Sequence, residues 1–286
     1  MQALLNGLAS GFAIALFAAA FQIVYLPTRI FYVGLAGIYT LAPFLALSFS
    51  GWMPWSVALL LASVAGATLS VICEVVIHRP LARTGASDGA HLISSLGVYV
   101  LLSQLVQGVW GNQTQSLGLP SDSALRMGDA LLTQGQVTTI LISLLLLGLL
   151  GLALRLTRIG TRLRALADNP KRFALLGFNV ATHRMIAFGV AGAFAAAASL
   201  LSAYDIGFDP HRGLPALLVG VVAVIAGGRS SFAAPVAAAL ILGVLQAQVR
   251  WNGSSSWVDA TTFAILAACL LFVPTGLFVR RTRIEV

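Results

Sequence analysis

Long stretches of apolar residues follow one another along almost the whole of this 286-residue chain. A helix needs about 20 predominantly apolar residues to cross the hydrocarbon layer of a membrane. We expect such helices at residues 3–26, 31–50, 55–77, 91–110, 137–156, 183–204, 214–228, 231–250 and 257–278. The stretch 214–228 is short for a full crossing, which predicts a broken or re-entrant element. The sequence therefore predicts an all-α, polytopic integral membrane protein with about 8–10 transmembrane or re-entrant helices.

The polar residues leave no room for a sizeable soluble domain. Residues 1–286 are expected to form a single transmembrane domain, in which the longest polar stretch, 111–136, is only a loop. The first apolar stretch lacks the basic n-region of a signal peptide, so we expect it to be retained as a helix. The two cysteines lie in apolar runs, and their spacing matches neither a disulfide framework nor a metal site.

The distribution of charge predicts the orientation in the membrane. The chain has 17 Lys and Arg residues against 9 Asp and Glu residues. If the N-terminus is outside, Arg126, Arg212 and Arg250 lie outside, and the other basic residues lie at or near the cytoplasmic side. Cytoplasmic loops of membrane proteins carry such an excess, and the opposite orientation would reverse it. We therefore predict an external N-terminus and a cytoplasmic C-terminus, and we expect no binding of nucleic acid.

A basic loop with a central proline separates two of the apolar runs, at residues 157–182. Good helix formers at residues 162–168 predict a short helix there. Asn169 offers an N-cap side chain and Pro170 suits the first position of a second helix. Gly177 suits the left-handed position just beyond the end of a helix. We therefore predict a second helix of about two turns with a defined start and end.

This second helix is expected to need support from elsewhere. Phe173 and Leu176 are three residues apart and are predicted to share one face. A helix this short is unstable by itself in water. Either its own membrane domain or a partner protein must hold it. The simpler alternative is a cytoplasmic loop whose arginines serve only to keep this side of the protein in the cytoplasm.

Several motifs along the chain carry a resemblance to one family. They are GTRLRALADNPKRFALLGFNV (160–180), HRPLAR (78–83), WGNQTQSL (110–117), LVGVVAVIAGGRSSFAAPVAAALILGVLQA (218–247) and FVPTGLF (272–278). The chain resembles permease subunits of the branched-chain amino acid ABC transporter family, which includes urea- and amide-type uptake permeases. The loop at 160–180 and the PTGLF motif are the specific parts of the resemblance, which covers nearly the whole chain.

The resemblance implies a transport subunit in a bacterial inner membrane rather than an enzyme, with no catalytic and no metal-binding residues. Its implied partners are a second permease, homologous or identical, two ABC ATPase subunits, an external solute-binding protein and the lipid bilayer. Residues 157–182 would then be a cytoplasmic coupling loop. The residues implied to couple to an ATPase are Arg164, Asp168, Asn169, Pro170, Lys171, Arg172, Phe173, Leu176 and Gly177.

The chain itself is expected to bind no cofactor. A Walker A motif needs a lysine after a Gly-rich loop, G-x-x-x-x-G-K-[ST]. The only lysine is Lys171, in the sequence NPKRF. ATP and Mg are therefore expected on the partner subunits.

One segment departs from the family pattern. After the first helix the family usually carries a sequence like N-F-A-H-G, whereas residues 29–44 here read RIFYVGLAGIYTLAPF and place Leu35 where the His is expected. Branched-chain amino acids are the default solute. If this segment lines the solute path, then urea, short amides or a small organic acid become alternatives.

Polar residues on the apolar runs are candidates for the solute path. They are Gln22, Tyr39, Thr40, Ser94, Ser95 and Gln104. The alternative is that the hydroxyl groups among them bond to their own or a neighbouring helix backbone. The external stretch YDIGFDPHRG is a candidate gate or contact for the binding protein, and the residues that could act there are Asp205, Asp209, His211 and Arg212. The alternative is a solvated turn.

Glu74 and His78 also suit other chemistry, because they are four residues apart. They suit either a proton relay or, as we favour, an interfacial pair beside Arg79. An ion-coupled transporter or channel would place acidic residues in mid-membrane, and Glu74 comes closest. An intramembrane enzyme would need a nucleophile and a base; the Ser, Asp and His of GASDGAH (85–91) better suit a helix cap by Ser87 or Asp88.

Two weaker patterns concern helix packing. Gly7 and Gly11 form a GxxxG motif, which lets helices approach closely. LPTR before Ile30 and DPHR before Gly213 each precede a Gly-rich helix. The predicted topology puts one motif inside and the other outside, as in an inverted repeat, although coincidence also explains the match.

Overall fold

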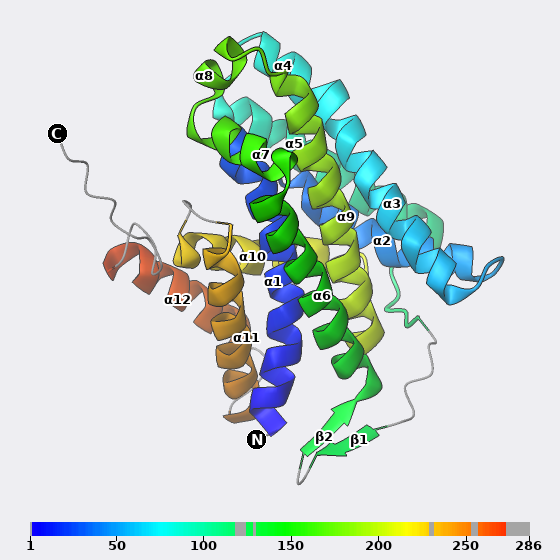
Figure 1. The fold of residues 1–286 in the computed structure, drawn as a ribbon. Coiled ribbons are helices and arrows are strands. Elements are labelled where there is room, and N and C mark those ends of the chain that lie inside the picture. Colours follow the sequence, from blue (N-terminus) through cyan, green and yellow to red (C-terminus); the bar gives the residue numbers. More distant parts are fainter. Residues whose placement is uncertain (1, 118–123, 128–129, 229–231, 253–256, 273–286) are drawn as a thin grey trace.

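The structure is a computed structural model that describes every residue except 1, 118–123, 128–129, 229–231, 253–256 and 273–286 (Figure 1). The described elements are α1 (Gln2–Thr28), α2 (Gly34–Ser50), α3 (Trp55–Cys73), the π-helical turn η1 (Glu74–His78), α4 (Arg79–Arg83), α5 (Asp88–Trp110), β1 (Ala124–Met127), β2 (Ala130–Thr133), α6 (Gln134–Leu156), α7 (Arg158–Asp168), α8 (Pro170–Leu175), α9 (Val180–Ile206), α10 (Gly213–Gly227), α11 (Ala234–Asn252) and α12 (Trp257–Phe272).

The apolar runs predict this architecture closely, because a helix lies within each of them. Among the described residues, six helices are long and apolar enough to cross a membrane, while α2 and α10 are shorter apolar helices of 17 and 15 residues. At 1.5 Å per residue, α10 spans about 22 Å, less than the hydrocarbon thickness of about 30 Å. The fold is therefore an all-α polytopic membrane protein, as predicted.

The prediction that 111–136 is only a loop is wrong. Strands β1 and β2 form an antiparallel pair in which Ala124 lies opposite Thr133. They form a hairpin beyond the start of α6, at the end of the molecule that also holds the N-terminus (Figure 1). Leu132 is buried there. Short hairpins of this kind are difficult to recognise because they have only a few alternating residues.

Helix α1 is the central element of the fold. It packs against α6, α9, α10 and α11 (Figure 1). The GxxxG motif makes the close contact with α11 that we expected: a Cβ atom on Gly7 would lie 2.7 Å from the Cα of Val244, and Gly243 lies against Gly11. Such contact is the means by which helices associate in lipid, where no hydrophobic force drives them together.

The LPTR and DPHR motifs each lead into a short apolar helix, α2 or α10. LPTR overlaps the end of α1, whose last residue is Thr28, whereas DPHR lies beyond Ile206, the last residue of α9. The two connections lie toward opposite ends of the molecule (Figure 1). The inverted repeat stays a prediction.

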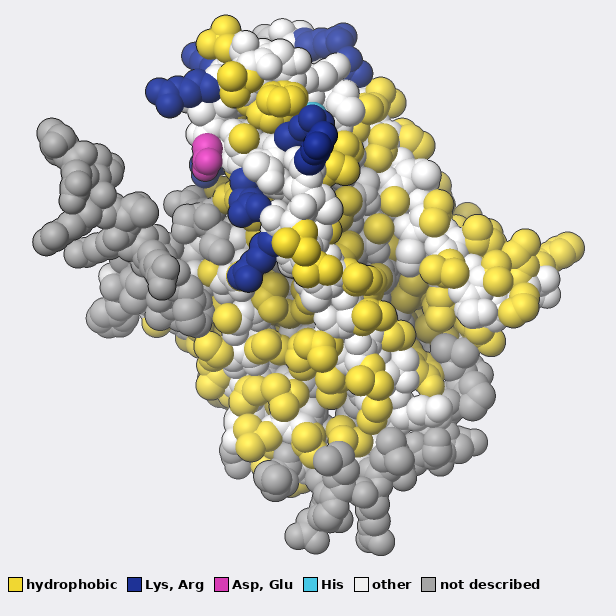
Figure 2. Space-filling model, viewed as in Figure 1, with side chains coloured by type: hydrophobic (Ala, Val, Ile, Leu, Met, Phe, Trp, Pro, Cys, Tyr) yellow, Lys and Arg dark blue, Asp and Glu magenta, His cyan; other side chains and the backbone are white. Residues whose placement is uncertain are grey.

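Positive charge gathers at one end of the molecule. On the face shown in Figure 2, Lys and Arg side chains lie over the end that carries α4, α7 and α8. The N-terminus and the hairpin lie at the other end (Figure 1). The side chain of Arg126 lies outside the described residues, as do Arg229, Arg280, Arg281, Arg283, the C-terminus and the whole PTGLF motif.

Candidate functional site: the α7–α9 loop and the polar groups behind it

Two capped helices, α7 and α8, build the basic loop. The Thr157 hydroxyl accepts a hydrogen bond from the amide of Gly160 at the start of α7. At the start of α8, Asn169 Oδ1 accepts one from the amide of Arg172 at 3.0 Å. Gly177 follows α8 with a φ of 83°, in the left-handed region. The predicted cap, first-turn proline and terminating glycine of the second helix are all confirmed, while α7 begins earlier than predicted.

The prediction that Phe173 and Leu176 share one face is wrong. Phe173 is only 2% exposed. Its ring stacks on Phe178 at 5.1 Å between centroids and meets the ring of His183 edge-on at the same distance. The guanidinium of Arg162 lies 4.8 Å from the centre of the Phe178 ring. Phe173 therefore fastens α8 to the start of α9 in its own chain. The six residues of α8 alone give no sign of this contact with α9.

The surface that α8 presents to the outside is a different one. Leu175 is 86% exposed and Leu176 is 71% exposed, beside the exposed side chains of Lys171 and Arg172. We call Pro170, Lys171, Arg172, Leu175 and Leu176 the α8 surface. Large exposed apolar side chains rimmed by polar ones mark protein interaction sites.

Arg164 and Asp168 lie away from the α8 surface. Arg164 donates a 2.6 Å hydrogen bond from Nη2 to the carbonyl of Leu154, which ties α7 to the end of α6. Both residues line a cavity on the α6 side of α7. The set of residues implied to couple to an ATPase therefore divides into capping residues, the α8 surface, buried Phe173 and these two cavity residues.

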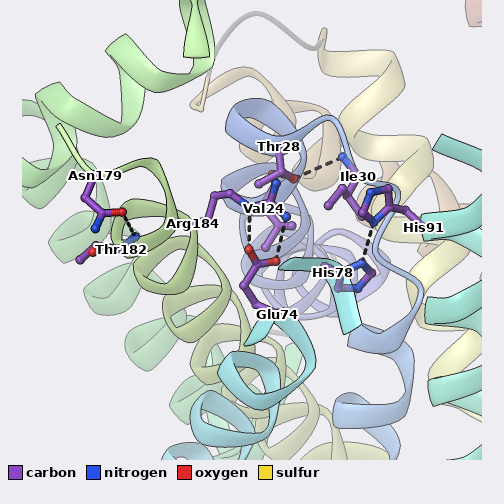
Figure 3. Close-up of polar contacts among 9 residues, drawn as sticks. All are labelled: Val24, Thr28, Ile30, Glu74, His78, His91, Asn179, Thr182 and Arg184. Atoms are coloured by element: carbon purple, nitrogen blue, oxygen red, sulfur yellow. Dashed lines mark hydrogen bonds and ion pairs between the residues drawn. The ribbon is translucent and has the colours of Figure 1, made fainter. Parts of the chain in front are cut away.

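A buried ion pair lies behind the loop (Figure 3). Arg184 Nε and Nη2 donate to the two carboxylate oxygens of Glu74 at 2.6 and 3.0 Å, and Glu74 is fully buried. The expectation that Glu74 and His78 form an interfacial pair beside Arg79 is therefore wrong, because Glu74 pairs with Arg184. Arg184 directly follows His183, the residue in contact with Phe173, so one turn of α9 touches both α8 and η1.

A second buried contact joins η1 to α5. His78 Nδ1 and His91 Nδ1 are 3.1 Å apart (Figure 3). One of the two rings must donate the proton and the other must accept it. The expected N-cap of α5 is confirmed, because the Ser87 side chain accepts from the amide of Ala90. His91 therefore belongs to a contact between helices rather than to a hydrolase triad.

At the other end of the molecule, the candidate external residues form linked turns. Asp209 accepts from the Arg212 guanidinium at 2.9 Å and from the amide of His211. His211 Nε2 lies 2.8 Å from Oδ1 of Asn112 in the other external loop. Asp205 lies apart from this group and accepts from the Thr133 hydroxyl.

A small crevice brings two predicted groups together. Tyr39 and Thr40 of α2 line it with Asp209 and Arg212. Its volume is about 10 Å³, enough for about one water molecule. The crevice is therefore closed to a solute the size of an amino acid in this conformation.

The remaining path candidates do not form a single channel. Gln22 is fully buried in α1, and Ser95 accepts from the amide of Val33 at 3.2 Å, which anchors the start of α2. Ser94 is half-buried, whereas Gln104 is exposed on α5. Leu35, at the position where the family carries a His, is fully buried in the core.

Sequence reasoning missed Arg184, because its partner is distant in the chain, and it missed His183 and Phe178, because they lie beyond α8 and are brought to Phe173 by the fold. The two halves of the Glu74–Arg184 pair are 110 residues apart. In the part of the chain that the structure describes, no group of three or more His, Cys, Asp or Glu residues could hold a metal ion.

Comparison with known proteins places this chain among transport proteins. Residues 3–274 match the family model described as "Branched-chain amino acid transport system / permease component". The chain is 26% identical over 298 residues to the high-affinity branched-chain amino acid transport system permease protein LivH of Escherichia coli (strain K12), covering 98% of this chain and 96% of LivH. It is 26% identical over 296 residues to the high-affinity branched-chain amino acid transport system permease protein BraD of Pseudomonas aeruginosa, covering 98% of this chain and 96% of BraD. LivH of Salmonella typhimurium is 29% identical over 215 residues, covering 72% of this chain and 68% of that protein.

Proposed function

The chain belongs to the branched-chain amino acid transport permease family, and from this premise we propose that α8 is the element on which a partner ATPase acts. The family makes the chain a permease subunit of an ABC importer, a multi-pass protein of the bacterial inner membrane that is not itself an enzyme. Residues 157–182 then form its cytoplasmic coupling loop. One observation carries the proposal: a capped helix outside the spans exposes Leu175 and Leu176.

A path for mechanical coupling starts at the α8 surface. When the ATPases close, they move α8, and the Phe173 ring passes that movement to His183 in α9. The next residue, Arg184, holds Glu74 at the end of α3. Helix α3 packs tightly on α9, since a Cβ atom on Gly66 would lie 2.8 Å from the Cβ of Ala196. ATP binding can then bias two conformations of the spans through differential contacts at α8.

The assembly that we propose contains a second permease, identical or homologous, two ATPase subunits that carry ATP and Mg, and an external solute-binding protein. The N-terminus lies outside and the C-terminus is cytoplasmic. The gathering of basic residues at the α4–α7–α8 end supports this orientation, by the positive-inside rule. The linked turns at Asp209, His211 and Asn112 lie at the opposite end and suit a contact with the binding protein.

The solute that we propose is a branched-chain amino acid, which is what the names of LivH and BraD state for those proteins. The crevice between Tyr39, Thr40, Asp209 and Arg212 is the proposed external entrance. In this conformation Asp209 and Arg212 pair with each other. Once separated, they would suit the carboxylate and ammonium groups of an amino acid, which urea lacks. Residues 29–44 supply Tyr39 and Thr40, so we propose that this segment contributes to solute choice.

An ion-coupled mechanism has less support. Glu74, the acidic residue nearest the middle of a predicted span, accepts two hydrogen bonds from Arg184. A carboxylate held in this way is already neutralised and does not offer a free site for a coupling ion.

Docking of the ATPase is tested by charge substitution on the α8 surface. Leu176→Asp in the assembled transporter should greatly reduce co-purification of the ATPase subunits, because it puts a charge into an apolar contact. Thr84→Asp is the matched control, since it adds the same charge at an exposed position in the loop after α4. Full ATPase recovery with Leu176→Asp would contradict the proposal.

Solute identity is tested separately. The complete transporter, reconstituted in vesicles with its binding protein, should hydrolyse ATP faster with leucine, isoleucine or valine than with urea or acetamide. Stimulation by urea alone would overturn the assignment of the solute and leave the docking role of α8 standing.

A further inference from the structure

A large cavity in the described part of the chain lies beside the coupling loop rather than on the proposed solute path. It has a volume of about 840 Å³ and lies between the end of α1, α6, α7 and the start of α11. Four charged side chains line it: Arg29, Arg155, Arg164 and Asp168. In Figure 2, basic side chains and an acidic one lie over α7 and the adjoining end of α6.

The walls of this cavity are hydrocarbon. Leu26 of α1, Leu147 and Leu150 of α6, and Val236 of α11 contribute apolar side chains. Gly148 of α6 also lines the cavity, and a Cβ atom added there would meet nothing within 4 Å, so the space beside α6 is open at that point. These apolar walls lie beside the charged side chains, so the cavity suits a ligand that has both a charged and an apolar part.

The cationic groups in the cavity are incompletely paired. Among the described residues, no side chain forms an ion pair with Arg29 or Arg155, and Arg164 is bonded only to the carbonyl oxygens of Gly160 and Leu154. Asp168 is the single acidic group on the wall and has no ion-pair partner there either. Three guanidinium groups against one carboxylate leave an excess of positive charge at the edge of a membrane span.

Helix α6 opens this cavity toward the lipid. Leu149, Leu152 and Leu156 are all more than half exposed on α6. These side chains continue from the cavity wall along a span that is largely unburied within the chain. A ligand bound here would have its charged part near the arginines and an apolar part along α6.

We propose that this cavity binds an anionic phospholipid, with its phosphate at Arg29 and Arg155 and its acyl chains along α6. Basic pockets between transmembrane helices on the cytoplasmic side hold anionic headgroups, and each Lys or Arg near the surface strengthens the attraction by about fivefold in binding. The bound lipid lies between α1, α6 and α7, and it therefore supports the base of the coupling loop. This inference does not depend on which solute is carried or on docking of an ATPase at α8.

The test measures binding of fluorescent phosphatidylglycerol to the delipidated, assembled transporter in detergent. Phosphatidylcholine, whose zwitterionic headgroup has no net charge, is the comparison. Phosphatidylglycerol should bind at least about tenfold more tightly. Arg29→Gln with Arg155→Gln should weaken its binding by roughly thirtyfold. Arg158→Gln is the matched control, because Arg158 lies on α7 outside the cavity lining, and it should leave the affinity unchanged.

The acidic residue provides a test of opposite sign. Asp168→Asn should tighten the binding of phosphatidylglycerol by several-fold, because it removes a negative charge beside the phosphate. This result also tests the lipid site if the double arginine variant fails to assemble. Equal binding of phosphatidylcholine, an unchanged affinity in the double variant, or weaker binding in Asp168→Asn would each overturn the proposal.

A competition experiment distinguishes binding of a lipid from binding of a free anion. Excess inorganic phosphate or glycerol 3-phosphate should displace little phosphatidylglycerol, because neither has acyl chains to place along α6. Complete displacement by inorganic phosphate would show a site for soluble anions and would overturn the assignment to lipid.

Discussion

At the scale of single residues, contacts between distant parts of the chain decide what each polar side chain does. The sequence predicts that Glu74 and His78 are notable, because ionisable residues are rare in apolar runs. It does not provide their partners, Arg184 and His91. Arg184 looks like one more cytoplasmic arginine until the fold brings it to Glu74. Partners of this kind depend on which helices pack together, and a single sequence carries no direct record of that.

The buried pair predicts a double-mutant cycle. Arg184→Met should destabilise the protein by about 3–5 kcal/mol, because it leaves the Glu74 carboxylate buried and unpaired. Glu74→Met combined with Arg184→Met should recover most of the loss, since a buried pair is often replaceable by apolar groups. Thermal unfolding in detergent measures both changes. Arg79→Met is the control and should have little effect, so an equal loss there would contradict the assigned pairing.

At the scale of elements, the basic loop shows which features of a helix can be predicted from its neighbouring residues alone. Asn169, Pro170 and Gly177 predict the start and end of α8 correctly, because caps and left-handed positions are local requirements. The buried face of α8 is not local. It depends on Phe178 and His183, which lie beyond the helix and are placed by α9.

The cap of α8 predicts a local effect. Asn169→Ala removes the acceptor for the Arg172 amide and should cost about 1 kcal/mol. Hydrogen exchange of the α8 amides should therefore become several-fold faster, while the temperature of global unfolding stays the same. Asn169→Ser keeps a capping oxygen and should behave almost like the original protein. Unchanged exchange in the alanine variant would mean that the Phe173 contacts alone hold the helix.

At the scale of the whole molecule, hydrophobic length and charge predict most of the architecture. Apolar runs give the helices, and the short α10 follows from its 15 residues. The hairpin β1–β2 and the π-helical turn η1 were missed, because each involves only a few residues and no periodic pattern. The path of the solute was predicted least well: Tyr39 and Thr40 reach a crevice with Arg212, whereas Ser95 anchors a helix and Gln104 is exposed.

The proposed orientation predicts the labelling of the two ends. In a variant without its native cysteines, a cysteine at Asn112 should react with a membrane-impermeant maleimide added to intact cells. A cysteine at Lys171 should react only after the membrane is opened. Both residues are exposed in this chain, and removing the ATPase subunits after the membrane is opened keeps a docked partner from shielding position 171. Labelling of Lys171→Cys from outside would reverse the topology and remove the basis for the coupling loop.

Contact between the α8 surface and a motor subunit is the central claim, and site-specific crosslinking tests it most directly. A photoreactive amino acid at position 176 of the assembled, membrane-embedded transporter should yield a covalent adduct with an ATPase subunit, whose yield changes when ATP is bound. The same group at position 112, at the other end of the molecule, should yield no such adduct. If position 176 crosslinks only to lipid or to nothing while the ATPases are bound and active, α8 is not the element through which they act.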